Sequence, residues 1–561
     1  MSKSDNIVLI LPRENSITYK NSYRESANVA ENVMKIASQD NYEVFREPLG
    51  IESIAAYLRD KNYSVKMFFC EMEDRKDEDI CRYIADNNVK FIGFSVIFDR
   101  HLEHALRLSM KLISAKAEIF FGGAFASFAA AEIVEKVDWI SGVLLGEGEK
   151  TVYNIIEKIY RGEEWKKVKG ICFSQKGQKA IFTEKEDKLD INQLPPPARD
   201  YLEKAIEKGY GITTASIYTS RGCAQSCTFC TGNQFTKFNK GKAWRYKTAE
   251  VVVDEIEMLV KKYGIQYFYI CDDNFFGYGN QAKDRIYNIV RLLNEKELKV
   301  QFHFEMRVDM VTDELLAVCK SGGFLDIFLG IESGVQSMLD RWKKSSTVEQ
   351  NLIAIQKVRE SGLRLNPGFI LYDEKTTFEE LKENLNFIRM ANLDSSEYIF
   401  DLFNPMQIFI GSTLQKSGNY ASRNNVDAMM DEIKKLVINI TKYDYEIQDK
   451  RVYIFWEIIR DIIDETNYYF NYYIIPTIYN NKKLYIKSKL MRYLSNFQKM
   501  RNNMGKILMD VSFFAVDIVD NIEDIEILKE SVRNYYTKIE NKYFQNGVKR
   551  DLEKAMINRD L

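Results

Sequence analysis

The sequence has almost no net charge, no long apolar run and few cysteines for its length, and each shortage excludes a class of protein. The formal net charge of -2 disfavours a nucleic-acid partner or an anionic membrane surface. No apolar run approaches the ~18 residues of a membrane-spanning helix, and the apolar run Ile7 to Leu11 is too short for a signal peptide. Eight cysteines in 561 residues do not form a disulfide framework, so we expect a reducing, cytoplasmic location.

What is present is the composition of a globular protein, with 45% hydrophobic and 29% charged residues. A chain of 561 residues is too long for one hydrophobic core and suggests about three domains. The pattern predicts an α/β domain at 1–165, a linker at 166–210, a second α/β domain at 211–424 and a mainly helical domain at 425–561. The linker is expected to contain a short hairpin and the proline-rich crossing Leu194 to Arg199.

Apolar strands alternate with helices in the first segment. We expect strands at 7–11, 63–70, 89–98, 118–121 and 139–145, with helical patterns between them. This alternation predicts a parallel, doubly wound, Rossmann-like sheet, which binds ligands at the carboxyl ends of its strands. Gly122-Gly123 and the run Gly146 to Glu149 fall at two of these ends, where glycine lets the backbone approach a large flat ligand.

Three cysteines, Cys223, Cys227 and Cys230, lie within eight positions of one another. Neighbours this close do not easily form unstrained disulfides, but they can converge on a soft metal or a cluster. A tetrahedral zinc site needs a fourth ligand nearby, and Cys271 is distant in sequence. A [4Fe-4S] cluster held by three thiolates leaves one iron open to a small molecule. A structural cluster or a zinc knot is the alternative interpretation.

The segment from Arg221 to Cys230 resembles the CxxxCxxC signature of the radical S-adenosylmethionine (radical SAM) family, including the aromatic Phe229 before the third cysteine. In that family SAM chelates the open iron, and reduction of the cluster splits SAM into methionine and a 5′-deoxyadenosyl radical. The resemblance implies a [4Fe-4S] cluster on Cys223, Cys227 and Cys230, SAM as a second cofactor, and an external electron donor such as flavodoxin or ferredoxin.

Six strand-helix units follow in the second domain, the last strand near Tyr398 to Phe403, and they predict a partial (β/α)6 TIM-type barrel. Polar residues end several of these strands, and the resemblance assigns SAM contacts to them. It gives Asp272 or Asp273 the methionine amino group, Glu332 and Ser333 the ribose, Phe229 the adenine, and Glu305 and Arg307 other polar contacts. Each acid taken singly is also explained by a helix N-cap or a surface ion pair. The basic, aromatic loop 237–244 is expected to be a solvated rim of the active site.

The first domain resembles the cobalamin-binding domain that precedes many radical SAM domains. The matching pieces are the helix start Pro48-Leu49-Gly50, the strand end Gly93-Phe94-Ser95, Gly122-Gly123 and Gly146-Glu147-Gly148-Glu149. The resemblance implies cobalamin contacts from Ser95, Val96, Phe98, Arg100, Gly122, Gly123, Gly146, Glu147 and Gly148. A flavodoxin-like domain that binds nothing, with glycines that only make turns, is the alternative.

One departure from the cobalamin domains concerns histidine. The Asp-x-His-x-x-Gly loop that places an imidazole under cobalt is absent, and the chain has only three histidines, His101, His104 and His303. We therefore expect cobalamin to bind without a histidine lower ligand. Phe98 and Arg100 are the candidates to cover its lower face, and His101 and His104 are expected to be an exposed helical pair.

Together the resemblances predict a cobalamin-dependent radical SAM enzyme. The expected reaction is methylation of an unactivated carbon of a small molecule or peptide, through the 5′-deoxyadenosyl radical and methylcobalamin. No further catalytic residue is assigned. Two alternatives stay open: a rearrangement, ring contraction or cyclisation without net methylation, and a corrinoid- and cluster-binding sensor without turnover. Neither a nucleic-acid partner nor a membrane span is expected.

Overall fold

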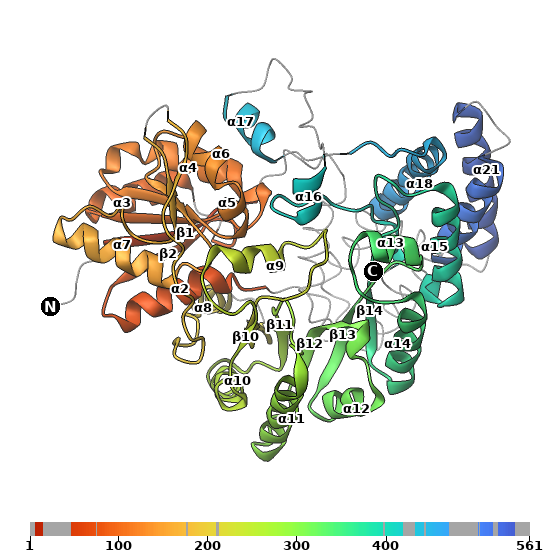
Figure 1. The fold of residues 1–561 in the computed structure, drawn as a ribbon, viewed down its shortest axis with the longest axis horizontal. Coiled ribbons are helices and arrows are strands. Elements are labelled where there is room, and N and C mark those ends of the chain that lie inside the picture. The colour runs from red at the N-terminus through yellow and green to blue at the C-terminus, as the bar shows by residue number, and fades with distance from the viewer. Residues whose placement is uncertain are drawn as a thin grey trace, which may run out of the picture.

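The computed structural model describes residues 6–14, 46–73, 76–175, 178–208, 212–395, 399–418, 432–441, 445–469, 503, 505–519 and 525–544. Figure 1 shows an N-terminal α/β body, coloured red to yellow, beside a barrel coloured green, with further helices in blue. Within the described ranges, no helix combines the length and the apolar character needed to cross a bilayer.

The first sheet has seven strands in the order β2-β1-β3-β4-β5-β6-β7. The strands are β1 (Ile7–Leu11), β2 (Val65–Phe69), β3 (Phe91–Ser95), β4 (Glu118–Gly122), β5 (Gly142–Leu144), β6 (Ile171–Phe173) and β7 (Ile181–Phe182). The first five are parallel, as predicted, and the order reverses between β1 and β3. In such sheets the crevice at the reversal, beyond the carboxyl ends of the strands, is the ligand site.

Helices cover both faces of this sheet. One face packs against α2 (Leu49–Asp60) and α7 (Glu149–Arg161). The other packs against α3 (Asp77–Asp86), α4 (Leu102–Lys111), α5 (Ala124–Phe128) and α6 (Ala130–Lys136), with η1 (Asp99–His101) before α4 and η2 (Ile113–Ala115) after it. Both faces of the strands are therefore apolar, and the prediction of a doubly wound, Rossmann-like domain is confirmed.

The predicted hairpin is present as β6 and β7, which pair antiparallel. It extends the first sheet, because β6 pairs with β5. Part of the segment expected to be a linker thus completes the first sheet. The exact domain boundaries at 165/166, 210/211 and 424/425 stay predictions.

The second domain holds a five-stranded parallel sheet in the order β14-β13-β12-β11-β8. Its strands are β8 (Thr214–Ile217), β11 (Tyr267–Ile270), β12 (Gln301–Arg307), β13 (Phe324–Glu332) and β14 (Arg364–Phe369). The helices α10 (Ala249–Tyr263), α11 (Gly279–Glu295), α12 (Asp313–Ser321), α14 (Val348–Ser361) and α15 (Phe378–Met390) enclose one apolar core with the outer face of this sheet. Shorter elements are α8 (Asp200–Glu207), β9 (Ser220–Arg221), α9 (Gly232–Phe235), η3 (Thr236–Phe238), β10 (Arg245–Tyr246), η4 (Val308–Met310), α13 (Gln336–Arg341) and η5 (Leu393–Ser395).

The prediction of a sixth barrel strand near Tyr398 to Phe403 is wrong. Residues Ile399–Phe403 form the 3-10 helix η6, and among the described residues one parallel bridge, between Tyr372 and Pro405, lies just after it in place of a sixth strand. The sequence explains the difference, because the buried side chains of Ile399, Leu402 and Phe403 recur with a helical period while Asp401 is exposed.

The remaining helices are α16 (Thr413–Ser417), α17 (Glu432–Thr441), α18 (Lys450–Tyr469), a helix at 505–518 and α21 (Ile525–Phe544). The helical prediction is confirmed for these ranges, whereas the tyrosine-rich stretch 470–479 lies outside the described residues. Ile433 and Val437 of α17 join the core of the first domain, and buried residues of α18, 505–518 and α21 join the core of the barrel. Figure 1 shows α16 between the two bodies.

A buried ionic network joins the two α/β domains. Arg199, in the proline-rich crossing, donates to Glu47 at 3.0 Å and to Glu255 of α10 at 2.6 Å. Lys247 donates to the second oxygen of Glu255 at 2.7 Å. Burial raises the pKa of Glu47 despite Arg199, whereas Lys247 and Arg199 outweigh burial at Glu255 and lower its pKa. Removing one partner from such a network leaves an uncompensated buried charge, at a cost of about 3–5 kcal/mol.

Candidate functional site

The inner face of the barrel sheet is polar although its outer face is apolar. The strand register aligns Ser216, Tyr269, His303, Asp326 and Arg364 across the five strands. Their side chains contact one another: Tyr269 and His303 stack with ring centroids 4.5 Å apart, and Arg364 pairs with Asp326. Burial lowers the pKa of His303 to about 4, so the ring is neutral. A polar inner face in a parallel sheet indicates a ligand-binding interior.

The cysteine loop starts where β9 ends. Asp272, after β11, accepts hydrogen bonds from Thr219 N at 2.6 Å and from Ser220 Oγ at 2.8 Å, which fixes the chain entering the loop. Gly222 has φ of +86°, and a Cβ there would collide with the carbonyl oxygen of Ala243. Glycine is therefore required at this position, because the loop 237–244 packs directly on the first turn of the cysteine loop.

The three predicted cluster ligands lie together in this loop. Each thiol interacts electrostatically with the other two, and burial is the largest cause that raises the pKa of Cys227 and brings that of Cys230 to about 12. Backbone N–H groups point at two of the sulfurs, from Gln225 to Cys223 at 3.5 Å and from Gly232 to Cys230 at 3.4 Å. Among the described residues, no three His, Cys, Asp or Glu side chains are placed to hold one metal ion.

The three neighbouring thiols and the N–H groups that point at two of them fit an iron-sulfur cluster rather than a single metal ion. Thiolate ligands of such clusters accept N–H hydrogen bonds that tune the reduction potential. Thiols whose pKa is raised by the surrounding protein lose their protons when a metal binds, because the ligand must be the thiolate. Cys223, Cys227 and Cys230 are therefore the residues that would hold the cluster.

Phe229 is held by two segments distant in sequence. Its ring meets that of Trp342 edge to face with centroids 6.1 Å apart. The preceding residue, Thr228, donates its N–H to the Trp342 carbonyl at 2.9 Å and accepts from Leu414 N of α16 at 2.8 Å. Phe229 is half-buried and therefore leaves part of its ring accessible.

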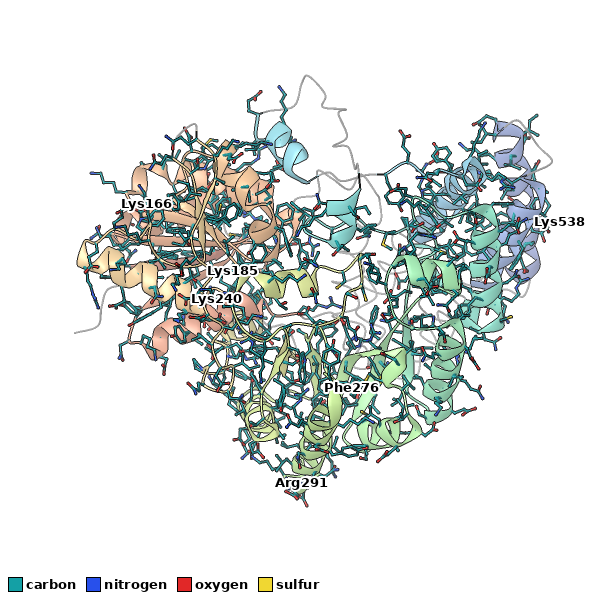
Figure 2. The ribbon with its side chains drawn as sticks, in the orientation of Figure 1. Lys166, Lys185, Lys240, Phe276, Arg291 and Lys538 are labelled. Atoms are coloured by element: carbon teal, nitrogen blue, oxygen red, sulfur yellow. The ribbon has the colours of Figure 1, made fainter. Side chains whose placement is uncertain are left out.

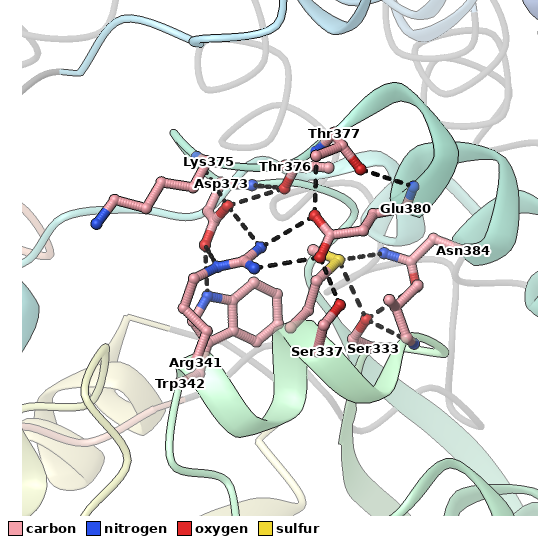
Figure 3. A network of polar contacts seen from close by, with 12 residues as sticks. Ser333, Ser337, Arg341, Trp342, Asp373, Lys375, Thr376, Thr377, Glu380 and Asn384 are labelled. Carbon is pink, nitrogen blue, oxygen red and sulfur yellow. Dashed lines mark hydrogen bonds and ion pairs between the residues drawn. The ribbon is translucent and has the colours of Figure 1, made fainter.

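Trp342 is in turn anchored by the network in Figure 3. Its indole N–H donates to Asp373 at 2.7 Å, and Arg341 contacts the same carboxylate with two nitrogens. Arg341 also reaches Glu380, at the start of α15. The segment beginning at Asp373 thus supports the cysteine loop through Trp342.

Asp272 and Asp273 are neighbours in sequence but differ in their surroundings. Asp272 is buried and its carboxylate is occupied by Thr219 and Ser220. Asp273 is exposed, yet desolvation by the surrounding protein and the charge of Asp272 raise its pKa to about 6. Gly222 N donates to it, so Asp273 lies beside the first residues of the cysteine loop. Asp273 therefore has a carboxylate available to a ligand, whereas Asp272 holds the loop.

Glu305, on the inner face of β12, is half-buried. Desolvation, and next the charge of Asp273, raise the pKa of its carboxyl to about 7. Two residues further on, Arg307 binds Asp309 and donates to the Lys344 carbonyl at 2.9 Å, and its guanidinium lies 3.9 Å from the Cys227 sulfur. Glu305 and Arg307 therefore bring opposite charges to the edge of the cysteine loop.

Glu332 ends β13 with φ of +64° and accepts from Lys344 Nζ at 2.6 Å. A non-glycine residue at positive φ is uncommon and marks strain at a position that the surrounding structure enforces. Lys344 was missed by the sequence prediction, and its only signal is the pair Lys343-Lys344 before helix α14. Its buried ammonium supplies a positive charge beside Glu332.

Ser333, the neighbour of Glu332, is fully buried. Its hydroxyl donates to Asn384 Oδ1 at 2.9 Å and accepts from Val335 N at 3.1 Å, as Figure 3 shows for Asn384. Asn351 donates to its carbonyl at 2.8 Å. The structure thus places Ser333 in a network that supports the turn after β13.

In the first domain, the ends of β3 and β4 are bound to each other. Val96 N donates to Gly122 O at 2.7 Å, and Ala126 N returns to Val96 O at 3.2 Å. Gly123 has φ of +99°, and a Cβ on it would lie 2.8 Å from that same carbonyl oxygen. The close approach of the two strand ends therefore requires the second glycine of the pair. Ser95 is half-buried at the end of β3.

Phe98 and Arg100 form the next part of this rim. The Phe98 ring is 44% exposed, and the Arg100 guanidinium lies over it at 3.8 Å from the centroid. Arg100 also pairs with Glu14, which follows β1. The pair therefore spans the reversal of strand order between β1 and β3, the ligand crevice of this class of sheet.

The prediction that His101 and His104 are exposed is wrong, since both are buried. Phe98 N donates to His101 Nδ1 at 3.3 Å, and Arg13 N donates to His104 Nδ1 at 3.0 Å. The second ring nitrogen of His104 lies 3.0 Å from Asp77. The residues of the β1 loop, rather than solvent, cover this side of α4, and helical periodicity alone does not reveal that.

The loop Gly146 to Glu149 faces the second domain. Glu147 binds Arg221 at 3.1 Å and also Arg245, while Glu149 binds the other end of Arg221 at 2.8 Å. Gly146 has φ of +69°, and a Cβ on it would collide with Asn239, whose side chain accepts from Glu147 N at 2.9 Å. Burial raises the pKa of the Glu149 carboxyl, but the positive charge and hydrogen bond of Arg221, together with the hydrogen bond from Ser53, have the larger combined effect, so the pKa is lowered.

Arg221 is two positions before Cys223, so this ion pair links the end of the first sheet to the cysteine loop. Sequence reasoning missed the pairing because the partners are 72 and 74 residues apart. The loop 237–244 lies nearby with Lys237, Lys240 and Lys242 exposed, and Figure 2 labels Lys240 next to Lys185. The exposure of these lysines agrees with the solvated rim that the sequence predicted.

The two domains match known families. Residues 40–156 match the B12 binding domain, and residues 217–388 match the radical SAM superfamily. The chain is therefore a B12-dependent radical SAM enzyme, and both resemblances drawn from the sequence are confirmed. Its cofactors are a [4Fe-4S] cluster, SAM and cobalamin.

Particular relatives differ in the reactions that their names state. An uncharacterized methyltransferase of Pyrococcus horikoshii is 25% identical over 356 residues, which cover 63% of this chain and 75% of the relative. The anaerobic magnesium-protoporphyrin IX monomethyl ester cyclase of Rubrivivax gelatinosus is 26% identical over 364 residues, 63% of each chain. The match thus spans less than two thirds of the cyclase.

The fold is similar to that of the cobalamin-dependent S-adenosylmethionine radical enzyme OxsB, solved with aqua-cobalamin and S-adenosylmethionine bound. The TM-score is 0.74 at 21% sequence identity, and the match covers 100% of this chain and 82% of OxsB. At this identity the similarity concerns the fold alone. It confirms the predicted order of a Rossmann-like domain, a radical SAM barrel and a helical region.

Proposed function

We propose that the protein is a methyltransferase that methylates an unactivated carbon of a small molecule or peptide. The observation that carries this proposal is the pairing of Arg221 with Glu147 and Glu149, because it joins the carboxyl end of the first sheet to the cysteine loop. A reaction that uses both cofactors on one substrate needs this proximity. The methyltransferase among the relatives supports the same reaction.

The cofactors supply the chemistry: when bound, the cluster and SAM provide a 5′-deoxyadenosyl radical that removes a hydrogen atom, and cobalamin provides the methyl group. An unactivated carbon has no lone pair or acidic proton, so a polar methyl transfer to it lacks a nucleophile. The protein binds and orients the cofactors and excludes water. An electron must enter from outside, and a flavodoxin or ferredoxin is the donor that we propose.

For SAM we favour five of the predicted contacts: Phe229, Asp273, Glu305, Arg307 and Glu332. Asp273 and Glu305 offer carboxylates to the amino group and the sulfonium, and Arg307 offers a guanidinium to the carboxylate. The remaining two, Asp272 and Ser333, are buried and bonded to other protein groups, whereas the five favoured side chains are half-buried or exposed. We assign these two to holding the loops that carry Asp273 and Glu332.

For cobalamin we propose the rim formed by Ser95, Val96, Phe98 and Arg100 together with Gly122 and Gly123. Both nitrogens of His104 have protein partners, and His101 Nδ1 accepts from Phe98 N. This supports a lower face without a histidine ligand, covered by Phe98 and Arg100. We place Gly146, Glu147 and Gly148 at the edge of the cofactor, where Glu147 also holds the second domain.

The test is anaerobic reconstitution with iron, sulfide and hydroxocobalamin, followed by turnover with SAM carrying a deuterated methyl group. Candidate substrates are lipids, peptides, antibiotic intermediates and tetrapyrroles. A product that gains the deuterated methyl, together with 5′-deoxyadenosine, is the expected result. A changed product without the label supports a cyclisation or rearrangement instead, a reaction that the related cyclase makes a second candidate. No 5′-deoxyadenosine from a fully loaded cluster supports a sensor.

A further inference from the structure

A tyrosine outside the cysteine motif contacts one of the cluster ligands. The hydroxyl of Tyr278, just before helix α11, lies 3.4 Å from the Cys223 sulfur. The same hydroxyl accepts a hydrogen bond from Ala224 N at 3.3 Å. Tyr278 is thus held against the first turn of the cysteine loop by two contacts on one oxygen atom.

The direction of the Tyr278 contact follows from chemistry. A cysteine that binds iron is a thiolate, which has no proton to donate and accepts hydrogen bonds. The lone pairs of the Tyr278 oxygen already receive Ala224 N–H, so its own proton points toward the sulfur. In the part of the chain that the structure describes, Gln225 N at 3.5 Å gives the Cys223 sulfur a second donor, whereas Cys230 has one backbone donor, Gly232 N at 3.4 Å.

The position of Tyr278 is fixed by packing. Gly277 has φ of +62°, and a Cβ there would collide with the ring of Trp244, so glycine lets the indole lie on the backbone. Trp244 donates its N–H to Asn274 O at 2.8 Å and meets the Tyr278 ring edge to face at 6.2 Å. The tyrosine is 37% exposed, so it stands at the solvent side of the cluster loop.

We propose that Tyr278 raises the reduction potential of the cluster by donating a hydrogen bond to Cys223. Reduction adds negative charge to the cluster and its sulfurs, and a donated hydrogen bond stabilises the reduced form more than the oxidised one. Tyr278 therefore acts on the cluster through Cys223, as a residue that tunes electron entry. The proposal rests on the cluster that the radical SAM domain implies, and it is independent of whether the reaction is a methylation.

The test compares Tyr278→Phe with the wild type and with Tyr246→Phe. Tyr246 also packs on Trp244, with centroids 4.9 Å apart, and has no contact with a cysteine among the described interactions, so it is a matched control. The midpoint potential is measured by anaerobic redox titration of the reconstituted protein, followed by the electron paramagnetic resonance signal of the reduced cluster. Because the midpoint does not depend on occupancy, unequal loading does not affect the comparison.

We expect Tyr278→Phe to lower the ratio of reduced to oxidised cluster about tenfold at a fixed potential, equivalent to ~59 mV for one electron. Tyr246→Phe should leave the midpoint unchanged. The wild-type cluster should also couple to an exchangeable proton that disappears in deuterium oxide and in Tyr278→Phe. An unchanged midpoint in Tyr278→Phe, or the same shift in both variants, overturns the proposal. If Tyr278→Phe lowers the midpoint potential but the wild type yields no methylated product, the proposal for Tyr278 holds and the methyltransferase proposal fails.

Discussion

The two parallel sheets of this protein treat their faces differently. In the first sheet, helices bury an apolar cluster on each face, and the glycine pairs Gly122-Gly123 and Gly146 to Gly148 lie at the strand ends. In the second sheet only the outer face is apolar, and the inner face carries Ser216, Tyr269, His303 and Glu305. We therefore expect the first sheet to bind its ligand at the strand ends and the second sheet to bind its ligand within the barrel.

The largest effect should come from the cysteine loop, which Arg221 joins to the end of the first sheet. Changing Cys223, Cys227 or Cys230 to Ala removes a cluster ligand and should abolish 5′-deoxyadenosine formation, while the corrinoid absorbance stays largely intact. Cys319→Ala, in the apolar core, is the control and should keep turnover. Equal loss of corrinoid in the ligand variants would contradict the separation of the two sites.

The next effect tests the two apolar faces of the first sheet. Phe91 and Ile92 are neighbours on β3, and each is buried in a different cluster. Both Phe91→Ala and Ile92→Ala should therefore destabilise the protein, by about 3–5 and 2–5 kcal/mol respectively. Chemical denaturation followed by circular dichroism measures this. A neutral Ile92→Ala would show that one face of this sheet is not a packed core.

The matching pair in the second sheet should behave in opposite ways. Phe304 is fully buried in the outer core, so Phe304→Ala should cost about 3–5 kcal/mol of stability and leave SAM affinity per folded molecule unchanged. Its neighbour Glu305 faces inward, and Glu305→Gln should weaken SAM binding by about 1.5–3 kcal/mol, the usual contribution of a hydrogen bond to a charged group. Calorimetric titration with SAM separates the two. Equal loss of affinity in both variants would contradict the distinction between faces.

The smallest effect concerns pH. Burial raises the pKa of Glu305 to about 7, so the carboxyl is largely protonated at pH 6 and ionised at pH 8. A ligand with a sulfonium prefers the carboxylate, so SAM affinity should rise with pH through about 7, by at most tenfold per pH unit. Glu305→Gln should remove this slope. A slope that persists in that variant would assign the titration to another group, such as Asp273.

Local patterns predicted most of the fold. The alternation of apolar strands with helices gave the doubly wound sheet and the barrel, because both periodicities are local. It failed at Ile399 to Phe403, where a short apolar run forms a 3-10 helix. Length and period do not distinguish such a run from a strand.

The candidate site was predictable only where a local motif carries it. The cysteine loop is such a motif, and the strand ends pointed to Glu305 and Glu332. Three residues were not foreseen, because their importance depends on partners that only the fold brings close. Arg221 pairs with Glu147 and Glu149. Lys344 pairs with Glu332, and Tyr278 contacts Cys223. The burial of His101 and His104 was missed for the same reason, since the covering residue Arg13 is 91 positions from His104 in the chain.

The buried network around Arg199 has a consequence for exchanging modules between related proteins. Arg199 belongs to the crossing, while its acidic partners Glu47 and Glu255 belong to the first and second domains. A hybrid joined at the proline-rich crossing would inherit some of these charges without their counterparts. We therefore expect recombination there to succeed only when the residues at 47, 199, 247 and 255 are inherited as a set.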